Sequence, residues 1–192
     1  MKKTSYFLAI IFLISYTSAQ SIRIGPTVGY TFPNSQDLDI QSVIDKSLEF
    51  DGDMHFGAKL KIGLPMLPVT ITGGFQYAKL SGSFNNLSTE QTIYVVSAGG
   101  EFAFIPGPIQ PYGALDLMYT SFGEFKTSNL SLSESNGRFG IGFGAGVDIK
   151  ILPMVDLDLS VKYALHNLIG KEDGEESFNT ANVSLSVLFN VL

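Results

Sequence analysis

The chain of 192 residues is acidic, with 12 basic and 18 acidic side chains and a formal net charge of −6, and it contains no cysteine. The lack of cysteine excludes a disulfide framework and a thiolate metal site, and the acidic balance argues against nucleic acid as a partner. At this length, one domain of ordinary size is expected.

Residues 1–19 are predicted to be a secretory signal peptide. Lys2 and Lys3 precede an apolar run of nine residues, and small residues ending at Ala19 follow it. This order indicates an exported chain that is cleaved after Ala19, because the apolar run is far shorter than the roughly 20 residues of a spanning helix. Residues 20–192 are then the mature domain.

The first predicted strand covers residues 22–32, where apolar and polar side chains alternate with a period of two. Pro26 lies within it, and because proline cannot donate to a ladder, a local distortion is expected there. The period is lost over residues 33–51, which are predicted to be a surface loop. Apolar side chains at helical spacing within residues 38–48 leave two interpretations, a loop packed on its own base or a short helix that covers the mouth of the fold or binds a partner.

Four further strands with the same period are expected between residues 54 and 120. Proline-rich segments at residues 65–68 and 105–111 join them in pairs, and such segments are predicted to be turns. A polar stretch separates the two pairs. The predicted strands are residues 54–64, 69–77, 93–104 and 112–120.

The clearest alternation lies between residues 139 and 166. The odd positions up to Ile151 are apolar and the even ones are Gly, Asp or Lys, and after a short break the same pattern continues from Val155. This predicts an antiparallel hairpin with one wholly apolar face. Its arms of about a dozen residues exceed the usual soluble strand and suit a strand that crosses a bilayer at a tilt. A last strand is expected over residues 183–191.

The chain is therefore predicted to be all-β, an eight-stranded antiparallel up-and-down transmembrane β-barrel. Short proline-bearing turns alternate with longer polar connections, and this asymmetry is typical of the periplasmic turns and extracellular loops of outer-membrane barrels. The extracellular loops are expected at residues 33–51, 80–91, 123–137 and 167–180.

The orientation of the two faces decides between a membrane barrel and a soluble lipocalin-like binding protein. Glycines such as Gly140 and Gly144 concentrate on the polar face. They favour a polar face that points inward, because a narrow eight-stranded lumen leaves little room for side chains. Ile93 and Val95 are exceptions, since they are apolar residues on the otherwise polar face.

Aromatic residues of the apolar face collect at the loop ends of the strands, as the interfacial girdle of a membrane barrel requires. They are Tyr30, Phe32, Phe56, Tyr77, Tyr94, Tyr119, Phe139 and Tyr163. A sparser ring near the turns is expected from Phe102, Phe104 and Phe189.

The charges of the polar face nearly balance, with six basic and five acidic residues. A buried interior needs such matching because an unpaired buried charge is very costly, so the apolar face is predicted to meet lipid. The basic residues are Arg23, Lys59, Lys61, Arg138, Lys150 and Lys162, and the acidic ones are Glu101, Asp116, Asp148, Asp156 and Asp158.

The whole mature chain resembles the small outer-membrane β-barrel family typified by OmpX and the transmembrane half of OmpA. The resemblance rests on a signal followed at once by a strand, on the arms RFGIGFGAGVDIKI and LPMVDLDLSVKY, and on a final strand close to the C-terminus. It implies residence among outer-membrane lipids and lipopolysaccharide, and insertion by the barrel-assembly machinery.

No catalytic, cofactor-binding or metal-binding residue is predicted. His55 and His166, expected on the inner face, lack the neighbouring serine of the known deacylases of this barrel size, so they are expected to join an interior hydrogen-bond network. The segment KEDGEE, residues 171–176, lacks the spacing of a calcium loop and is predicted to be a solvated acidic loop.

These patterns predict a monomeric outer-membrane protein that is not an enzyme and that has a structural or surface-interaction role through its extracellular loops. No open pore is expected, because side chains fill an eight-stranded lumen. The alternatives are a lipid-modifying outer-membrane enzyme and a soluble lipocalin-like binding protein. The extracellular partner is not identified by the sequence.

Overall fold

The computed structural model describes residues 21–34, 49–65, 67–84, 87–127, 130–132, 137–170 and 177–191, which form ten β-strands. None of these segments is a helix of the length and apolarity that crossing a bilayer requires. The strands are β1 Ser21–Asn34, β2 Glu49–Asp51, β3 Asp53–Gly63, β4 Val69–Phe84, β5 Leu87–Ala103, β6 Ile109–Thr127, β7 Leu130–Leu132, β8 Gly137–Leu152, β9 Val155–Ile169 and β10 Asn179–Asn190.

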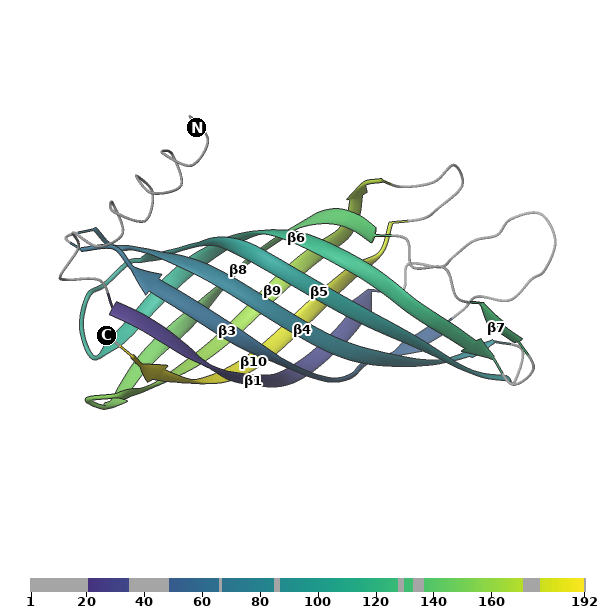
Figure 1. The fold of residues 1–192 in the computed structure, drawn as a ribbon, viewed down its shortest axis with the longest axis horizontal. Coiled ribbons are helices and arrows are strands. Elements are labelled where there is room, and N and C mark those ends of the chain that lie inside the picture. The colour runs from purple at the N-terminus through teal and green to yellow at the C-terminus, as the bar shows by residue number, and fades with distance from the viewer. Residues whose placement is uncertain are drawn as a thin grey trace, which may run out of the picture.

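The eight long strands close into an antiparallel barrel, which confirms the predicted fold (Figure 1). Their hydrogen-bonded order around the wall is β1-β3-β4-β5-β6-β8-β9-β10. Pairing of β10 with β1 closes the wall, with Ile24 opposite Phe189 and Tyr30 opposite Val183. The short strands β2 and β7 pair with the loop ends of β4 and β6. A closed wall leaves no open sheet edge in the bilayer, where water cannot satisfy backbone groups.

The connections from β3 to β4, β5 to β6 and β8 to β9 are short and lie at one end of the barrel. Backbone hydrogen bonds tie neighbouring turns and strands together there. The Ala103 amide donates to the Pro68 carbonyl at 2.8 Å, and the Lys150 amide donates to the Pro108 carbonyl at 2.8 Å. The predicted proline-bearing turns are therefore confirmed, and they define the turn side of the barrel.

At the loop side, several strands run further than predicted. The loops expected at residues 80–91 and 123–137 are largely wrong, because β4 continues to Phe84, β5 begins at Leu87 and β6 continues to Thr127. The backbones of β4 and β5 pair as far as these ends. Beyond the bilayer a ladder needs no apolar face, so the loss of the two-residue period there does not mark the end of a strand.

The remaining loop predictions are met only in part. The loop at residues 167–180 is shortened, because β9 extends to Ile169 and β10 begins at Asn179. The predicted signal peptide at residues 1–19, the segment 38–48 and the acidic segment 171–176 lie outside the described residues.

Pro26 does not produce the predicted distortion. The pairs on either side of it, Ile24 with Phe189 and Thr27 with Ser186, keep a single register between β1 and β10. On the other side β1 pairs continuously with β3 through this position. The strand therefore accommodates the proline without a bulge.

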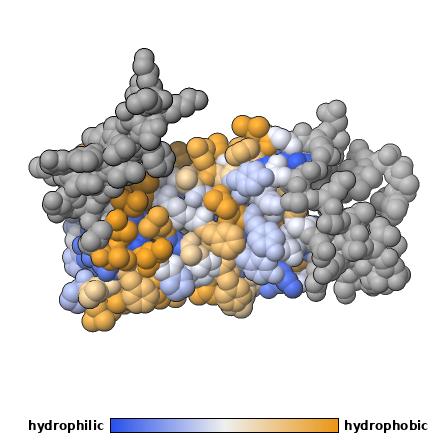
Figure 2. Space-filling view, viewed as in Figure 1, coloured by the Kyte–Doolittle hydropathy of each residue, from blue (hydrophilic) through white to orange (hydrophobic). Residues whose placement is uncertain are grey.

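The apolar face points outward and the polar face inward, as predicted. Phe143 and Leu159 are 49% and 46% exposed, whereas Lys61 and Asp158 are completely buried. Figure 2 shows hydrophobic side chains, in orange, spread over the visible wall of the barrel. The large exposed apolar surface of this chain is thus the surface that lipid covers.

The glycines of the inner face lie where neighbouring backbone leaves no room for a side chain. A Cβ on Gly140 would lie 2.0 Å from the Leu165 carbonyl oxygen, and one on Gly144 would lie 2.1 Å from the Val161 carbonyl oxygen. Both contacts are too short for any side chain, so the predicted shortage of space in the lumen is confirmed.

The predicted aromatic girdle lies on the outer surface. Tyr77 and Tyr163 are only partly exposed because each ring packs against another girdle or wall ring, at centroid distances of 5.3 Å to Tyr94 and 5.7 Å to Phe143. The other girdle members, all exposed, are Tyr30, Phe32, Phe56, Tyr94, Tyr119 and Phe139. The sparser turn-side ring of Phe102, Phe104 and Phe189 is also exposed.

Candidate functional site

An ion network fills the lumen in the turn-side half of the barrel. Lys61 lies at its centre, and its Nζ contacts Glu101 Oε2 at 2.6 Å, Asp148 Oδ2 at 3.0 Å and a carboxylate oxygen of Asp158. Lys59 shares Glu101 and Asp158, at 2.9 and 2.7 Å. Two ammonium groups therefore hold three buried carboxylates.

Arg23 and Tyr112 complete this network. The Arg23 Nη1 donates to Asp148 at 3.0 Å and to Asp156 at 2.9 Å. The Tyr112 hydroxyl donates to Asp158 Oδ2 at 2.7 Å. Because each charge faces an opposite one, the network avoids the large cost of an isolated buried charge.

Attraction in the network acts across the lumen and not along neighbouring strands. The register places Arg23 of β1 opposite Lys61 of β3, and Asp148 of β8 opposite Asp158 of β9. Like charges are thus neighbours on the wall, and each pair is satisfied by the pair facing it. The network therefore requires a closed barrel.

A second ion pair, between Lys162 and Asp116, lies in the middle of the barrel. Asp116 also accepts a hydrogen bond from Thr72 Oγ1 at 3.1 Å. A cavity of about 90 Å³ adjoins the pair, and small polar residues such as Ser97 and Ser160 contribute to its lining. That volume has room for several water molecules, since each needs about 10–15 Å³.

Each histidine lies between two hydroxyl groups in the lumen. His55 Nδ1 is 2.9 Å from Thr31 Oγ1, and its Nε2 is 3.0 Å from Ser184 Oγ. Threonine hydroxyls of β6 and β10 hold the ring of His166 in the same way, at 2.9 and 2.8 Å. Both histidines thus belong to the interior hydrogen-bond network, as predicted. A hydrolytic general base would instead need a nucleophile on one side and an orienting carboxylate on the other.

The buried carboxylates are already neutralised. Within the described part of the chain, Glu101, Asp148 and Asp158 are the group whose oxygens lie close enough to share a metal ion, within 4.8 Å of one another. The ammonium of Lys61 contacts all three. A lysine therefore occupies the position that a cation would take.

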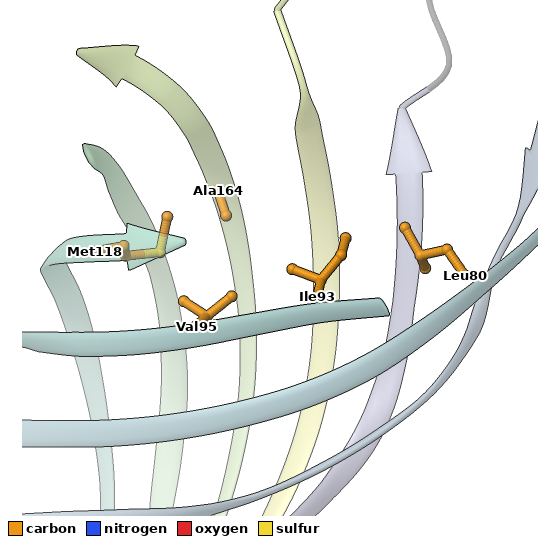
Figure 3. Packing of buried hydrophobic residues seen from close by; sticks show 5 residues of the cluster. All are labelled: Leu80, Ile93, Val95, Met118 and Ala164. Atoms are coloured by element: carbon orange, nitrogen blue, oxygen red, sulfur yellow. The ribbon is translucent and has the colours of Figure 1, made fainter. Parts of the chain in front are cut away.

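Apolar residues close the loop-side half of the lumen. Ile93 and Val95, the exceptions on the polar face, are 3% and 5% exposed. They form an apolar plug whose side chains point into the barrel in Figure 3, namely Leu80, Ile93, Val95, Met118 and Ala164, with Phe122 and Phe178 packed against it. Sequence analysis missed this plug because Leu80 falls in a segment predicted to be a loop.

An outer sheet rises beyond the girdle on one side of the barrel. β4 continues from Tyr77 to Phe84 and pairs there with β5, which adds about 20 Å of strand at 3.3 Å per residue. Figure 1 shows β4, β5 and β6 reaching furthest at this end, with β7 beside their tip. The order in the outer sheet is β2-β4-β5-β6-β7. Among the described strands, β2 and β7 each pair on one side only and form the two edges of this sheet.

Comparison with known proteins identifies the class of this barrel. Residues 5–190 match the family described as "Outer membrane protein beta-barrel domain". The chain belongs to this family. It is accordingly an integral protein of the outer membrane, which it crosses with the strands of its barrel.

Relatives within the outer-membrane β-barrel family differ widely in sequence. Outer membrane protein X of Enterobacter cloacae is 22% identical over 160 residues, which cover 83% of this chain and 87% of that protein. The structure of Neisserial surface protein A aligns with a TM-score of 0.58 at 13% identity, over 90% of this chain and 97% of that one. Ail of Yersinia pestis, solved with the heparin analogue sucrose octasulfate, aligns with a TM-score of 0.52 at 19% identity, over 89% and 97% of the two chains. At these identities the structural matches show a shared fold.

Two charges predicted for the lumen of this outer-membrane barrel lie away from the network. Lys150 is on the inner face, as predicted, but it is exposed because it lies at the turn-side end of β8. Lys150 keeps the register of β8 with β9, opposite Asp156, and borders the turn-side opening of the lumen together with Arg23 and Asp156. Arg138 is buried, but it lies near the loop-side start of β8.

Proposed function

We propose that this outer-membrane barrel is a monomeric, non-enzymatic surface protein whose outer sheet binds an extended segment of an extracellular partner. The observation that carries the proposal is that β2 and β7 each pair on one side only among the strands that the structure describes. An open edge presents unpaired N–H and C=O groups, and a further strand can add to it. The barrel wall anchors the outer sheet, because β4, β5 and β6 run from the wall into this sheet.

The charge of the loop side favours a cationic partner. Residues 20–192 hold 10 basic and 18 acidic residues, because Lys2 and Lys3 fall in the predicted signal. The inner face accounts for six basic and five acidic ones, and the turns hold none, so the loop-side segments keep four basic and thirteen acidic residues. Their net charge of −9 attracts cationic segments and repels polyanions.

The pairings in the lumen support a role without catalysis. Hydroxyl groups hold both histidine rings, and ammonium or guanidinium groups hold the network carboxylates. These are the groups that a lipid-modifying enzyme would use. A mass-spectrometric profile of lipid A from cells with and without the protein tests this part, and a change in acylation that depends on the protein would overturn it. Insertion by the barrel-assembly machinery and contact with lipopolysaccharide stay predictions.

The binding proposal is tested with labelled peptides and the folded protein in detergent micelles. A decapeptide of alternating Lys and Val is expected to bind, and added salt is expected to weaken it. A decapeptide of alternating Glu and Val tests the role of charge. A decapeptide of alternating Lys and Pro has the charge of the Lys and Val peptide and tests strand pairing, because proline has no N–H to donate to a neighbouring strand. Neither control peptide is expected to bind.

A shortened variant tests the location of the binding. Residues 82–89 are replaced by Asn-Gly, which forms a tight hairpin while the plug residue Leu80 is retained. This variant loses most of the part of β4 that pairs with β2, whereas the pairing of β6 with β7 is retained. It is expected to bind the Lys and Val peptide more weakly and to keep the heat-modifiable gel migration of a folded barrel. Undiminished binding by the shortened variant would contradict addition at the β2 edge, and equal binding of the Lys and Pro peptide would contradict strand pairing.

A further inference from the structure

The lipid-facing wall contains a shallow hollow that crosses β5, β6 and β8. Its floor consists of Gly113 on β6 and Ala145 on β8, which lie opposite each other in the register. Gly113 is close to Ile109, the turn-side start of β6. Since short turns face the periplasm in outer-membrane barrels, the hollow lies at the level of the periplasmic leaflet.

Large apolar side chains stand on two sides of this floor. Phe104 lies over Gly113, because a Cβ on that glycine would be 3.2 Å from the Phe104 ring. The ring of Phe102 packs edge-on against Phe104, with centroids 5.9 Å apart. Toward the middle of the bilayer, Leu115 and Phe143 lie opposite each other, and both are exposed. The small floor residues thus have large apolar side chains on two sides.

The lining of the hollow offers lipid an apolar surface. Glu101 also borders it, but the Glu101 carboxylate points into the lumen, where it contacts Lys59 and Lys61. The side chains that reach the outer face are Val69, Phe102, Phe104, Leu115, Phe143 and Ala145. A ligand in the hollow therefore gains contact with carbon atoms and no ionic partner.

We propose that this hollow holds one acyl chain of a periplasmic-leaflet lipid more tightly than the rest of the lipid-facing wall does. A methylene chain on a convex wall touches protein on one side, whereas in the hollow it touches the floor and both rims, which adds dispersion contacts. A second copy of the chain fits less well. Two convex barrels meet along a line, and a stable protein interface needs about 800 Å² from each partner.

The chain contains no tryptophan, so an introduced one reports on its own surroundings. Phe104→Trp places the probe at the rim of the hollow, and Phe189→Trp is the matched control, an exposed turn-side phenylalanine on β10. The proteins are held in detergent micelles, and phosphatidylethanolamine brominated in its acyl chains is added. Half-maximal quenching of the Phe104→Trp probe is expected at an about fivefold lower lipid mole fraction than that of the control.

A filling variant makes the outcome decisive. Ala145→Leu, combined with Phe104→Trp, removes the space above the floor and is expected to shift the quenching curve to that of the control. Equal curves for the two single-tryptophan proteins, or no effect of Ala145→Leu, would overturn the proposal. Resistance of the Phe104→Trp probe to quenching, together with sedimentation as a dimer, would assign the hollow to a second copy and would equally overturn it.

Discussion

Replacement of Lys61 by methionine tests the ion network most sharply. Methionine keeps the apolar stem of the side chain but removes the ammonium that contacts Glu101, Asp148 and Asp158. Lys59 and Arg23 then remain to hold the network carboxylates. Because Lys61 is completely buried, no water can replace it, and breaking a buried ion pair from one side costs about 3–5 kcal/mol. We expect the free energy of unfolding of Lys61→Met to fall by about that amount.

The assay is urea unfolding in lipid vesicles, followed by heat-modifiable gel migration. Lys150→Met is the matched control, since Lys150 is exposed, and its effect is expected to stay within about 0.5 kcal/mol. Adding Asp158→Asn to Lys61→Met restores the charge balance, so the double variant is expected to lose about 0.5–3 kcal/mol less than the sum of the two single variants. Equal stability of Lys61→Met and Lys150→Met would refute the reasoning.

Three further predictions use the same unfolding assay. His55→Leu leaves the hydroxyls of Thr31 and Ser184 without their histidine partner, so the free energy of unfolding is expected to fall by about 1–3 kcal/mol. The lipid A profile is expected to stay the same, and a changed profile would contradict the structural role of His55. Leu80→Ala, in the apolar plug, is expected to cost about 2–5 kcal/mol, and a neutral effect would show that the plug is not packed. Gly144→Ala should prevent a stable barrel because of the backbone 2.1 Å from its Cβ, whereas Gly100→Ala, whose Cβ would lie 3.7 Å from its nearest neighbour, should fold normally.

The wall of the barrel could be predicted from sequence because successive side chains of a strand point to opposite faces, with a period of two residues. Once one residue of a strand is assigned to a face, as Phe143 is in β8, the other residues of that strand follow by parity. The proline-bearing turns then fix which strands are neighbours. Membership of the inner face was therefore predictable for Lys59, Lys61 and Asp158 before any contact was known.

Contacts across the lumen could not be predicted in the same way. They depend on how the strands stagger when β10 meets β1, and the alternation within a strand carries no information on that stagger. Like charges are neighbours on the wall, so a pairing of adjacent strands would have suggested repulsion between Asp148 and Asp158. The strand ends beyond the girdle escaped prediction for a related reason, because outside the bilayer the backbone pairs without an apolar face. Leu80, an apolar residue at an inward position of β4, was the available signal of the plug.

The orientation of the wall is the central claim, and a cysteine scan of β9 tests it directly. The chain has no native cysteine, so single cysteines from Val155 to Leu165 can carry a spin label in the folded protein in lipid vesicles. Collision with dissolved oxygen, which concentrates in the bilayer, is expected to alternate along the strand. Labels at Leu157, Leu159 and Val161 should collide often, and those at the intervening positions should not. A scan without alternation, or with the high values at the intervening positions, would contradict a barrel whose apolar face meets lipid.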